Sequence, residues 1–249
     1  MPQISNLIQI PTQPLISIVG AGGKTTTMYT LAAELAQRGK RVITTTTTNI
    51  FPPQQGETDE LIIAAETPTL LKMIRDAWKQ HHQLTVAASI SGVGKLVGLQ
   101  LEQPHELLRG SGADAVIVEA DGARHLMIKA PAEHEPVMPI RSNVVLVVMS
   151  AEAIYQPLNP AIAHRPERIA AIVGMKEGEI LTPARIAKLV LHEQGGLKNV
   201  PDGADVYLLI THAAVERQAA VQEVAMLVQS SSRVADIYYS PQPLEWYAF

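Results

Sequence analysis

Cysteine is absent from the 249-residue chain. Without thiols the protein has no disulfides, no thiolate zinc or iron–sulfur ligands and no cysteine nucleophile. Aromatic residues make up only 4% of the chain, whereas hydrophobic residues together make up 47%. The core must therefore consist mainly of aliphatic side chains and methionine. A chain of this length and composition can bury such a core without covalent or metal cross-links.

Long apolar segments and clusters of positive charge are also missing. No apolar run approaches the ~18 residues that a membrane-spanning helix needs. The first residues, Met-Pro-Gln-Ile-Ser-Asn, contain neither the basic segment nor the apolar core of a secretory signal peptide. The formal net charge is −4, and no basic stripe points to nucleic acid. We therefore expect a cytoplasmic protein that binds neither membranes nor nucleic acids.

A glycine-rich segment follows the first apolar run of the chain. Residues 15–19 predict a buried strand and residues 24–38 a helix, and Gly-Ala-Gly-Gly at 20–23 lies between them. The order strand, glycine loop, Lys-Thr and helix is that of a phosphate-binding loop, in which backbone N–H groups face the anion. We expect Lys24 to contact the outer phosphates of a nucleotide and Thr25 to bind Mg²⁺. The predicted phosphate-binding residues are Gly20, Ala21, Gly22, Gly23, Lys24, Thr25 and Thr26.

This loop is shorter than the common pattern G-x-x-x-x-G-K-[ST], whose first glycine would fall at Ile18. The shorter form resembles the loop of Mur-type ATP-dependent ligases. The alternative is a strand-to-helix turn without a ligand, and the combination of three glycines, a lysine and three threonines argues against it. A similar segment, Ser-Gly-Val-Gly-Lys at 91–95, has Leu96 where Ser or Thr is required, so we interpret it as a hairpin turn.

Two carboxylates follow the apolar run at 115–118. Glu119 and Asp121 lie two residues apart, so an extended chain directs both side chains to the same side. Beside a phosphate loop such carboxylates bind Mg²⁺ or orient a nucleophile, whereas alone they would indicate only an acidic turn at a strand end. Because the loop is present, we predict Lys24, Glu119 and Asp121 as catalytic residues and Thr25 and Asp121 as metal ligands.

Two further segments are candidates for contacts with a second substrate. Five threonines at 44–48 and Asn49 follow the second predicted strand, at the sheet edge where ligands bind in open α/β folds. An ordinary β-branched strand end is the alternative. Residues 123–139 carry cations and bases among prolines, which indicates either a rigid substrate wall or an exposed loop. The residues proposed to contact substrate are Thr46, Thr48, Asn49, Arg124, His125, Lys129, Glu133 and His134.

The remaining pattern predicts an α/β fold. Apolar runs at 42–46, 143–149 and 206–211 are typical of buried parallel strands, and helical patterns recur at 166–173, 183–193 and 215–229. We expect a single P-loop NTPase-like domain over residues 1–249, with a mostly parallel sheet flanked by helices. A strand–helix–hairpin region around 57–100 is predicted as an insertion, and residues 234–239 as the last strand.

Taken in order, these motifs resemble the YqeC family, over nearly the whole chain. The resemblance is carried by the glycine loop, by the threonine run with Asn49 and the following Pro-Pro, by residues 118–122 (Val-Glu-Ala-Asp-Gly) with 129–136, and by Gly-Gly-Leu-Lys at 195–198. The family is described as an accessory protein of selenium-dependent molybdenum hydroxylases. The resemblance therefore implies a molybdenum hydroxylase or a cofactor-maturation protein as the partner.

Three functions remain open from the sequence. The first is a nucleotide-binding maturation factor with Mg²⁺-dependent NTPase activity. The second, suggested by the Mur-like loop, is an ATP-dependent small-molecule ligase or kinase, and the third is a non-catalytic docking module. ATP is favoured over GTP as the nucleotide bound with Mg²⁺. The reason is that Thr-His-Ala-Ala at 211–214 occupies the place of the guanine-reading Asn-Lys-x-Asp motif of GTPases and lacks its acid.

Overall fold

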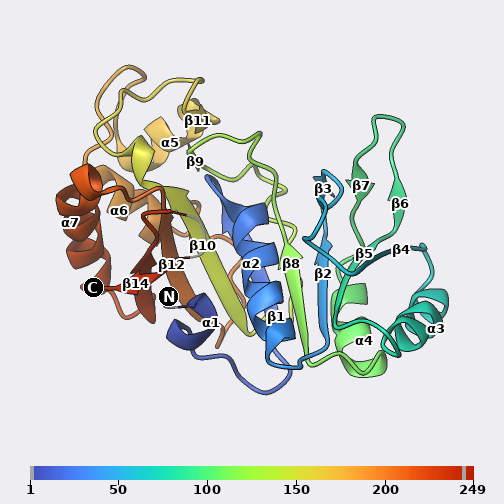
Figure 1. The fold of residues 1–249 in the computed structure, drawn as a ribbon. Coiled ribbons are helices and arrows are strands. Elements are labelled where there is room, and N and C mark those ends of the chain that lie inside the picture. Colours follow the sequence, from blue (N-terminus) through green and yellow to red (C-terminus); the bar gives the residue numbers. More distant parts are fainter. Residues whose placement is uncertain (1–2, 243–244) are drawn as a thin grey trace.

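The computed structural model describes residues 3–242 and 245–249, and a nine-stranded sheet runs through its centre (Figure 1). The strand order is β14-β13-β12-β10-β1-β8-β2-β5-β4, and every neighbouring pair is parallel except β13 and β14. This confirms the predicted mostly parallel sheet. The strands are β1 (Leu15–Gly20), β2 (Val42–Thr46), β4 (Glu60–Ile63), β5 (Gln83–Ala87), β8 (Ala115–Glu119), β10 (Val144–Ser150), β12 (Asp205–Thr211), β13 (Asp236–Tyr239) and β14 (Tyr247–Ala248).

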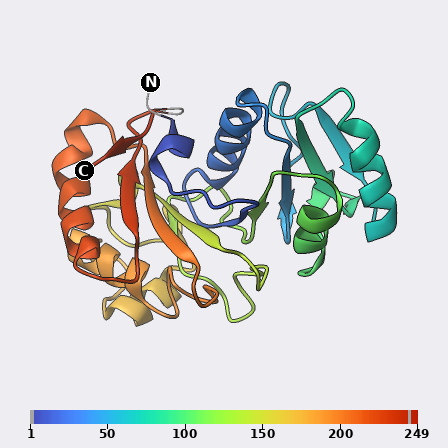
Figure 2. The same cartoon turned by 90° about the horizontal axis from the view of Figure 1, so that it is seen from below.

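Helices cover both faces of this sheet (Figure 2). Alternate residues of β1 explain the two layers, since Ile16 and Ile18 pack with α1 and α2, whereas Val19 packs in the cluster formed with α5, α6 and α7. Helices α3 and α4 pack in a third cluster against the β2, β4, β5 and β8 part of the sheet. The helices are α1 (Ile4–Leu7), α2 (Lys24–Gln37), α3 (Thr67–Ala77), α4 (Gln103–Gly110), α5 (Pro166–Val173), α6 (Pro183–Leu191) and α7 (Gln218–Gln229), with short 3₁₀ turns η1 (Ala151–Ala153) and η2 (Val215–Arg217).

The region predicted as an insertion is joined to the main sheet. Strands β4 and β5, with α3 between them, extend the sheet beyond β2. Only the hairpin stands apart: β6 (Ser89–Ile90) and β7 (Leu96–Val97) form a small antiparallel sheet with β3 (Asn49–Ile50). This hairpin projects past the carboxyl ends of the main strands (Figure 1). The similar-looking segment at 91–95 therefore forms its turn and lies in another part of the fold from the glycine loop.

The carboxyl-terminal tail adds a strand that the sequence did not predict. β13 is not the last strand, because β14 pairs with it antiparallel and closes that end of the sheet. Tyr247 stacks on Tyr239 at 5.6 Å between ring centroids, which is consistent with the predicted packing of the tail on the body. Among the residues that the structure describes, no helix has the length and hydrophobicity that crossing a bilayer requires.

Strand register brings the predicted site residues to one edge of the sheet. β1 lies between β10 and β8, and Glu119 at the end of β8 is opposite Ile18 of β1 and Thr46 of β2. A second small pair, β9 (Ile128–Lys129) with β11 (Ala163–His164), lies beyond this edge. The loop at 20–23 and the residues after Glu119 therefore leave neighbouring strands side by side.

Candidate functional site

The glycine loop connects the central strand β1 to helix α2 as predicted. Gly20, Gly22 and Gly23 all have positive φ (100°, 73° and 124°), which side chains rarely adopt. A Cβ on Gly20 would lie 2.1 Å from the carbonyl oxygen of Val148, and one on Gly22 would lie 2.7 Å from Ser150 Cβ. The glycines are thus required by the close approach of the loop to β10, independently of any ligand.

Not every N–H group of the loop is free to meet an anion. Gly20 N–H donates to Asp121 Oδ2 (3.0 Å), and Ala21 N–H donates to the carbonyl of Val148 (2.9 Å). The first N–H groups of an α-helix have no acceptor inside the helix, and the N-cap of α2 is Gly23, which offers no side-chain cap. The N–H groups of Gly20 and Ala21 are thus already paired within the protein.

Lys24 lies buried among acceptors. Its side chain is 4% exposed, and Nζ donates to the carbonyl of Gly20 (2.8 Å). The same Nζ lies 3.3 Å from Asp121 Oδ1 and 3.7 Å from Glu119 Oε1. The structure thus brings together the three residues that the sequence predicted as catalytic.

Glu119 and Thr25 face each other across the same site. The Thr25 hydroxyl donates to Glu119 Oε2 at 2.7 Å. Burial raises the pKa of Glu119 and the neighbouring Asp121 carboxylate adds to this, whereas Lys24 and the Thr25 hydroxyl act in the opposite direction. The pKa of Glu119 therefore depends on whether Lys24 and Thr25 keep their contacts with this buried carboxyl group.

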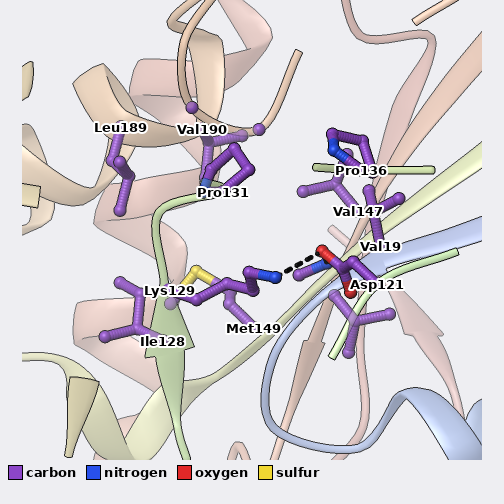
Figure 3. Close-up of a pocket in the computed structure, with 14 residues that line it drawn as sticks. Val19, Asp121, Ile128, Lys129, Pro131, Pro136, Val147, Met149, Leu189 and Val190 are labelled. Atoms are coloured by element: carbon purple, nitrogen blue, oxygen red, sulfur yellow. Dashed lines mark hydrogen bonds and ion pairs between the residues drawn. The ribbon is translucent and has the colours of Figure 1, made fainter. Parts of the chain in front are cut away.

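Asp121 links the loop to the segment that follows it. Its Oδ2 lies 3.0 Å from Lys129 Nζ, the contact marked in Figure 3. Its Oδ1 accepts no hydrogen bond in the described part of the chain, although Lys24 Nζ lies 3.3 Å away. A buried carboxylate oxygen without a hydrogen bond is uncommon and fits a position that a cation or a donor from a ligand would satisfy.

These groups suit Mg²⁺ in type, because hydroxyl and carboxylate oxygens are its usual protein ligands. Thr25 and Asp121 would hold the ion, and Glu119 lies beside both. Among residues 3–242 and 245–249, no three Asp, Glu, His or Cys side chains gather as a metal cage.

Alternating charges extend from Asp121 to the surface. Lys129, 1% exposed in its side chain, donates to Gly122 O (2.7 Å) and lies 2.8 Å from Glu135 Oε2. Glu135 in turn accepts two hydrogen bonds from Arg165, at 2.7 and 3.1 Å. Burial by itself raises the pKa of Glu135, but the hydrogen bonds from Arg165 and Lys129 outweigh it and lower the pKa to about 2.

This lowered pKa predicts a specific pH dependence of stability. Because the pKa of Glu135 is about 2 in the folded protein against an ordinary value of 4.5, its stabilising effect is complete above about pH 4.5 and is lost as the pH falls towards 2. The free energy of unfolding of wild type should exceed that of Glu135→Gln most at neutral pH, and the difference should shrink between about pH 5 and 2. Urea unfolding across that range measures it. A difference that does not vary with pH would contradict the proposed ion pairs.

The hydroxyl groups of the threonine run form hydrogen bonds within the protein. Thr44 and Thr45 hydrogen-bond across to β5, and the Thr46 hydroxyl donates to the carbonyl of Glu119 at 2.7 Å. Thr48 lies 3.2 Å from Thr46 between hydroxyl oxygens. Asn49 is exposed in β3. Thr46 and Thr48 are thus adjacent to the acidic pair through Glu119, and their contact with a substrate stays a prediction.

The predicted substrate residues of 123–139 separate into two groups. Lys129 is buried and joined to Asp121, as described above. Arg124 and His125 are exposed with positive φ (52° and 59°), and His125 stacks on Phe51 at 5.7 Å between ring centroids. Glu133 and His134 are exposed, and in the described part of the chain their side chains form no hydrogen bond or ion pair. A substrate role for these four residues stays a prediction.

Several residues of the site were not predicted. Arg165 holds Glu135 from a position 30 residues away in the sequence, and Lys198 donates to the carbonyl of Glu133 at 2.9 Å. The Thr211 hydroxyl donates to the carbonyl of Gly22, joining β12 to the loop. Arg165 lies in no motif noted in the sequence, and Lys198 was noted only as the end of the Gly-Gly-Leu-Lys motif at 195–198, so only the tertiary structure gives either residue its place beside the 129–135 segment. Thr211 was noted only as the place of a missing guanine motif.

These features define the class: an α/β protein in which the central parallel strand leads through a glycine loop into a helix and faces a buried acidic pair. Within it, the chain belongs to the YqeC family. The model of that family, described as YqeC protein, matches residues 16–167. A relative named Uncharacterized protein YqeC, from Escherichia coli (strain K12), is 34% identical over 195 residues, which are 76% of this chain and 72% of the relative.

Solved structures share the arrangement only distantly. Signal Recognition Particle 54 kDa protein from Aeropyrum pernix K1, solved in complex with GDP, is 17% identical with a TM-score of 0.46, and the match covers 99% of this chain and 46% of that one. The MinC:MinD cell division protein complex of Aquifex aeolicus is 14% identical with a TM-score of 0.42, covering 93% and 82%. The chain thus spans about half the length of the signal recognition protein.

Proposed function

We propose that this protein binds a nucleoside triphosphate with Mg²⁺ at the glycine loop. The observation that carries the proposal is the convergence of Lys24, Thr25, Glu119 and Asp121 on one buried spot at the carboxyl edge of the sheet. The start of α2 presents N–H groups there and carries partial positive charge. The phosphates of a nucleotide suit Lys24 and the N–H groups of α2, and a divalent cation suits the two carboxylates and the Thr25 hydroxyl.

Each residue has a distinct part in binding. Lys24 exchanges its contacts with Gly20 O and the acidic pair for the outer phosphate oxygens, so phosphate charge is neutralised by a buried ammonium. Thr25 and Asp121 hold Mg²⁺, which when bound neutralises phosphate charge and orients the phosphates. Gly20 N–H and Lys129 keep the Asp121 carboxylate in place from the other side. Positioning and charge neutralisation of this kind are what phosphoryl transfer requires.

A hollow lies beside the loop, and we propose that the nucleoside rests against its lining. It has a volume of about 60 Å³ and is lined by Gly23, three threonines of α2 and Thr211, together with His212, Ser240 and Trp246. This lining offers hydroxyls, an imidazole and an indole, and it contains no carboxylate. The guanine-reading motif of GTPases uses a carboxylate to accept from guanine N1 and N2 together, and this lining has none, so we propose ATP as the nucleotide.

Hydrolysis of the nucleotide is the reaction that the cavity next to Asp121 supports. This cavity, shown in Figure 3, has a volume of about 30 Å³ and is lined by Gly20, Asp121 and Lys129 together with apolar side chains. A space of that size is large enough to hold a water molecule. We therefore propose a Mg²⁺-dependent NTPase, with Asp121 orienting the attacking water.

Nucleotide titrations test the proposal. Calorimetry should detect binding of ATP in the presence of Mg²⁺, weaker binding when EDTA replaces Mg²⁺, and weaker binding of GTP. Trp246 lines the nucleoside hollow, so its fluorescence should change on binding in a Trp78→Phe variant, which leaves Trp246 as the sole tryptophan of the two. Absence of ATP binding at millimolar concentration would refute the proposal.

The family resemblance extends the proposal to a cellular role. We propose that the nucleotide-bound protein takes part in the maturation of a selenium-dependent molybdenum hydroxylase in the cytoplasm. The support is the family resemblance. Pull-down from cells that express such a hydroxylase should enrich it in an ATP-dependent manner, and equal recovery with and without nucleotide would count against the role.

A further inference from the structure

A second hollow lies at the opposite edge of the sheet from the glycine loop. It has a volume of about 280 Å³ and is lined at the entries to β1 and β10 and by α4, with the residues Thr12, Gln13, Leu15, His105, Leu108, Arg109, Arg141 and Asn143. β1 separates it from the loop by its six residues, or roughly 20 Å. Figure 1 shows α4 at the lower end of the sheet, away from the start of α2. This basal hollow is therefore distinct from the proposed nucleotide site.

The ionisable groups of the basal hollow are all basic. His105 and Arg109 lie one turn apart on α4, and Arg141 approaches from the segment before β10. None of these three side chains forms an ion pair or hydrogen bond within residues 3–242 and 245–249. Burial lowers the pKa of His105, and Arg141 and Arg109 lower it further, whereas Glu106 acts in the opposite direction.

The negative end of α4 accounts for only part of this basic cluster. Arg109 in the last turn of α4 complements the negative end of that helix. Arg141 is on no helix and has no such role. Uncompensated cations lining one hollow are notable in a chain of net charge −4. In the described part of the chain neither arginine has an ion-pair partner, so both are available to an anion from outside the chain.

Neutral donors complete the lining. Asn143 Oδ1 accepts a hydrogen bond from Leu15 N–H at 2.9 Å, which fixes the amide and leaves its NH₂ group to donate elsewhere. Thr12 and Gln13 are exposed at the rim, and Gln13 supplies two more amide donors. No carboxylate lines this hollow. The polar side chains of this hollow can all donate hydrogen bonds and none of them is a carboxylate. Such a lining suits an oxyanion.

We propose that the basal hollow binds the phosphate group of a small phosphorylated organic compound. Two arginine forks match the geometry of a phosphate dianion. An adjoining hollow of about 380 Å³ shares His105 and Arg141 and is lined by Leu101, Pro139 and Ile140, so the organic body of the compound rests on apolar side chains. Glu102 and Glu106 also line this second part and would repel further phosphates. This favours a monoester over a nucleic-acid backbone.

The test uses phenyl phosphate as a probe in the Lys24→Ala background, where phosphate binding at the glycine loop is expected to be weakened. Calorimetry should show saturable binding, and Arg141→Ala or Arg109→Ala should weaken it at least tenfold. Both arginines are exposed, so neither substitution should unfold the protein. Arg233→Ala, which removes an exposed arginine paired with Glu193 at 3.8 Å, is the matched control and should bind as before.

Comparing phenyl phosphate with inorganic phosphate distinguishes an organic phosphate monoester from free phosphate as the ligand. Tighter binding of phenyl phosphate than of inorganic phosphate supports an organic monoester, whereas equal binding overturns that part and assigns free phosphate. No binding in the Lys24→Ala background, or unchanged affinity in Arg141→Ala, overturns the site altogether. Because the probe is measured without the loop lysine, these results stand whether or not the protein binds nucleotide.

Discussion

Lys24→Ala is expected to weaken the binding of Mg·ATP at least tenfold, or about 1.4 kcal/mol. The ammonium group lies within 3.7 Å of both carboxylates and is the single cation of the predicted loop. Its loss removes the charge that neutralises the outer phosphates, and it leaves Glu119 and Asp121 to repel the same phosphates. Calorimetric titration of ATP with Mg²⁺ into wild type and variant measures the change.

The chain supplies its own control for this experiment. Lys95 ends a segment that resembles a phosphate loop, but it lies in the β6–β7 hairpin, with Nζ 4.6 Å from the centre of the Phe51 ring. Lys95→Ala should bind Mg·ATP as wild type does. A second variant, Lys24→Gln, keeps a donor for the Gly20 carbonyl and separates loss of charge from loss of folding. If Lys24→Ala and wild type bind equally, the loop is not a triphosphate site.

Lys129→Met should produce the largest loss of stability, about 3–5 kcal/mol in the free energy of unfolding. The ammonium group of Lys129 lies 3.0 Å from Asp121 and 2.8 Å from Glu135, and it donates to the Gly122 carbonyl. Methionine fills the space but removes the cation that Asp121 and Glu135 share, which leaves Asp121 with Lys24 alone, Glu135 with Arg165 alone and the Gly122 carbonyl without its donor. Urea unfolding at neutral pH, with the slope compared between variants, gives the difference.

An exposed ion pair provides the comparison. Lys79 lies 2.8 Å from Asp76, with the two side chains 73% and 62% exposed. Lys79→Met should therefore change the free energy of unfolding by less than about 1 kcal/mol. A loss for Lys129→Met as small as this one would mean that the charges of Asp121 and Glu135 are compensated by other groups, and the positioning role proposed for Lys129 would fail.

Much of the fold was predictable because its strands are buried on both faces. The runs at 15–19, 42–46 and 206–211 are nearly continuous in apolar or β-branched residues, which is how central parallel strands differ from surface strands. The arrangement of the 57–100 region was harder to predict from the sequence. Its strand β4 is short and half-exposed, so the sequence does not show that it pairs with β5 at the edge of the main sheet. β14, with two residues, carries no periodic signal at all.

The sequence by itself determined the phosphate loop, the acidic pair and their order, since these are local patterns whose chemistry depends on neighbouring residues. Only the tertiary structure decided that Lys129 and Arg165 flank the acidic pair and that His105, Arg109 and Arg141 meet at the far edge. The pairing of β9 with β11 places Lys129 and Arg165, and the packing of α4 beside the entries to β1 and β10 places the three basic residues. The physical reason is that backbone geometry limits a local motif to few arrangements, whereas contacts between distant segments follow from packing of the whole sheet.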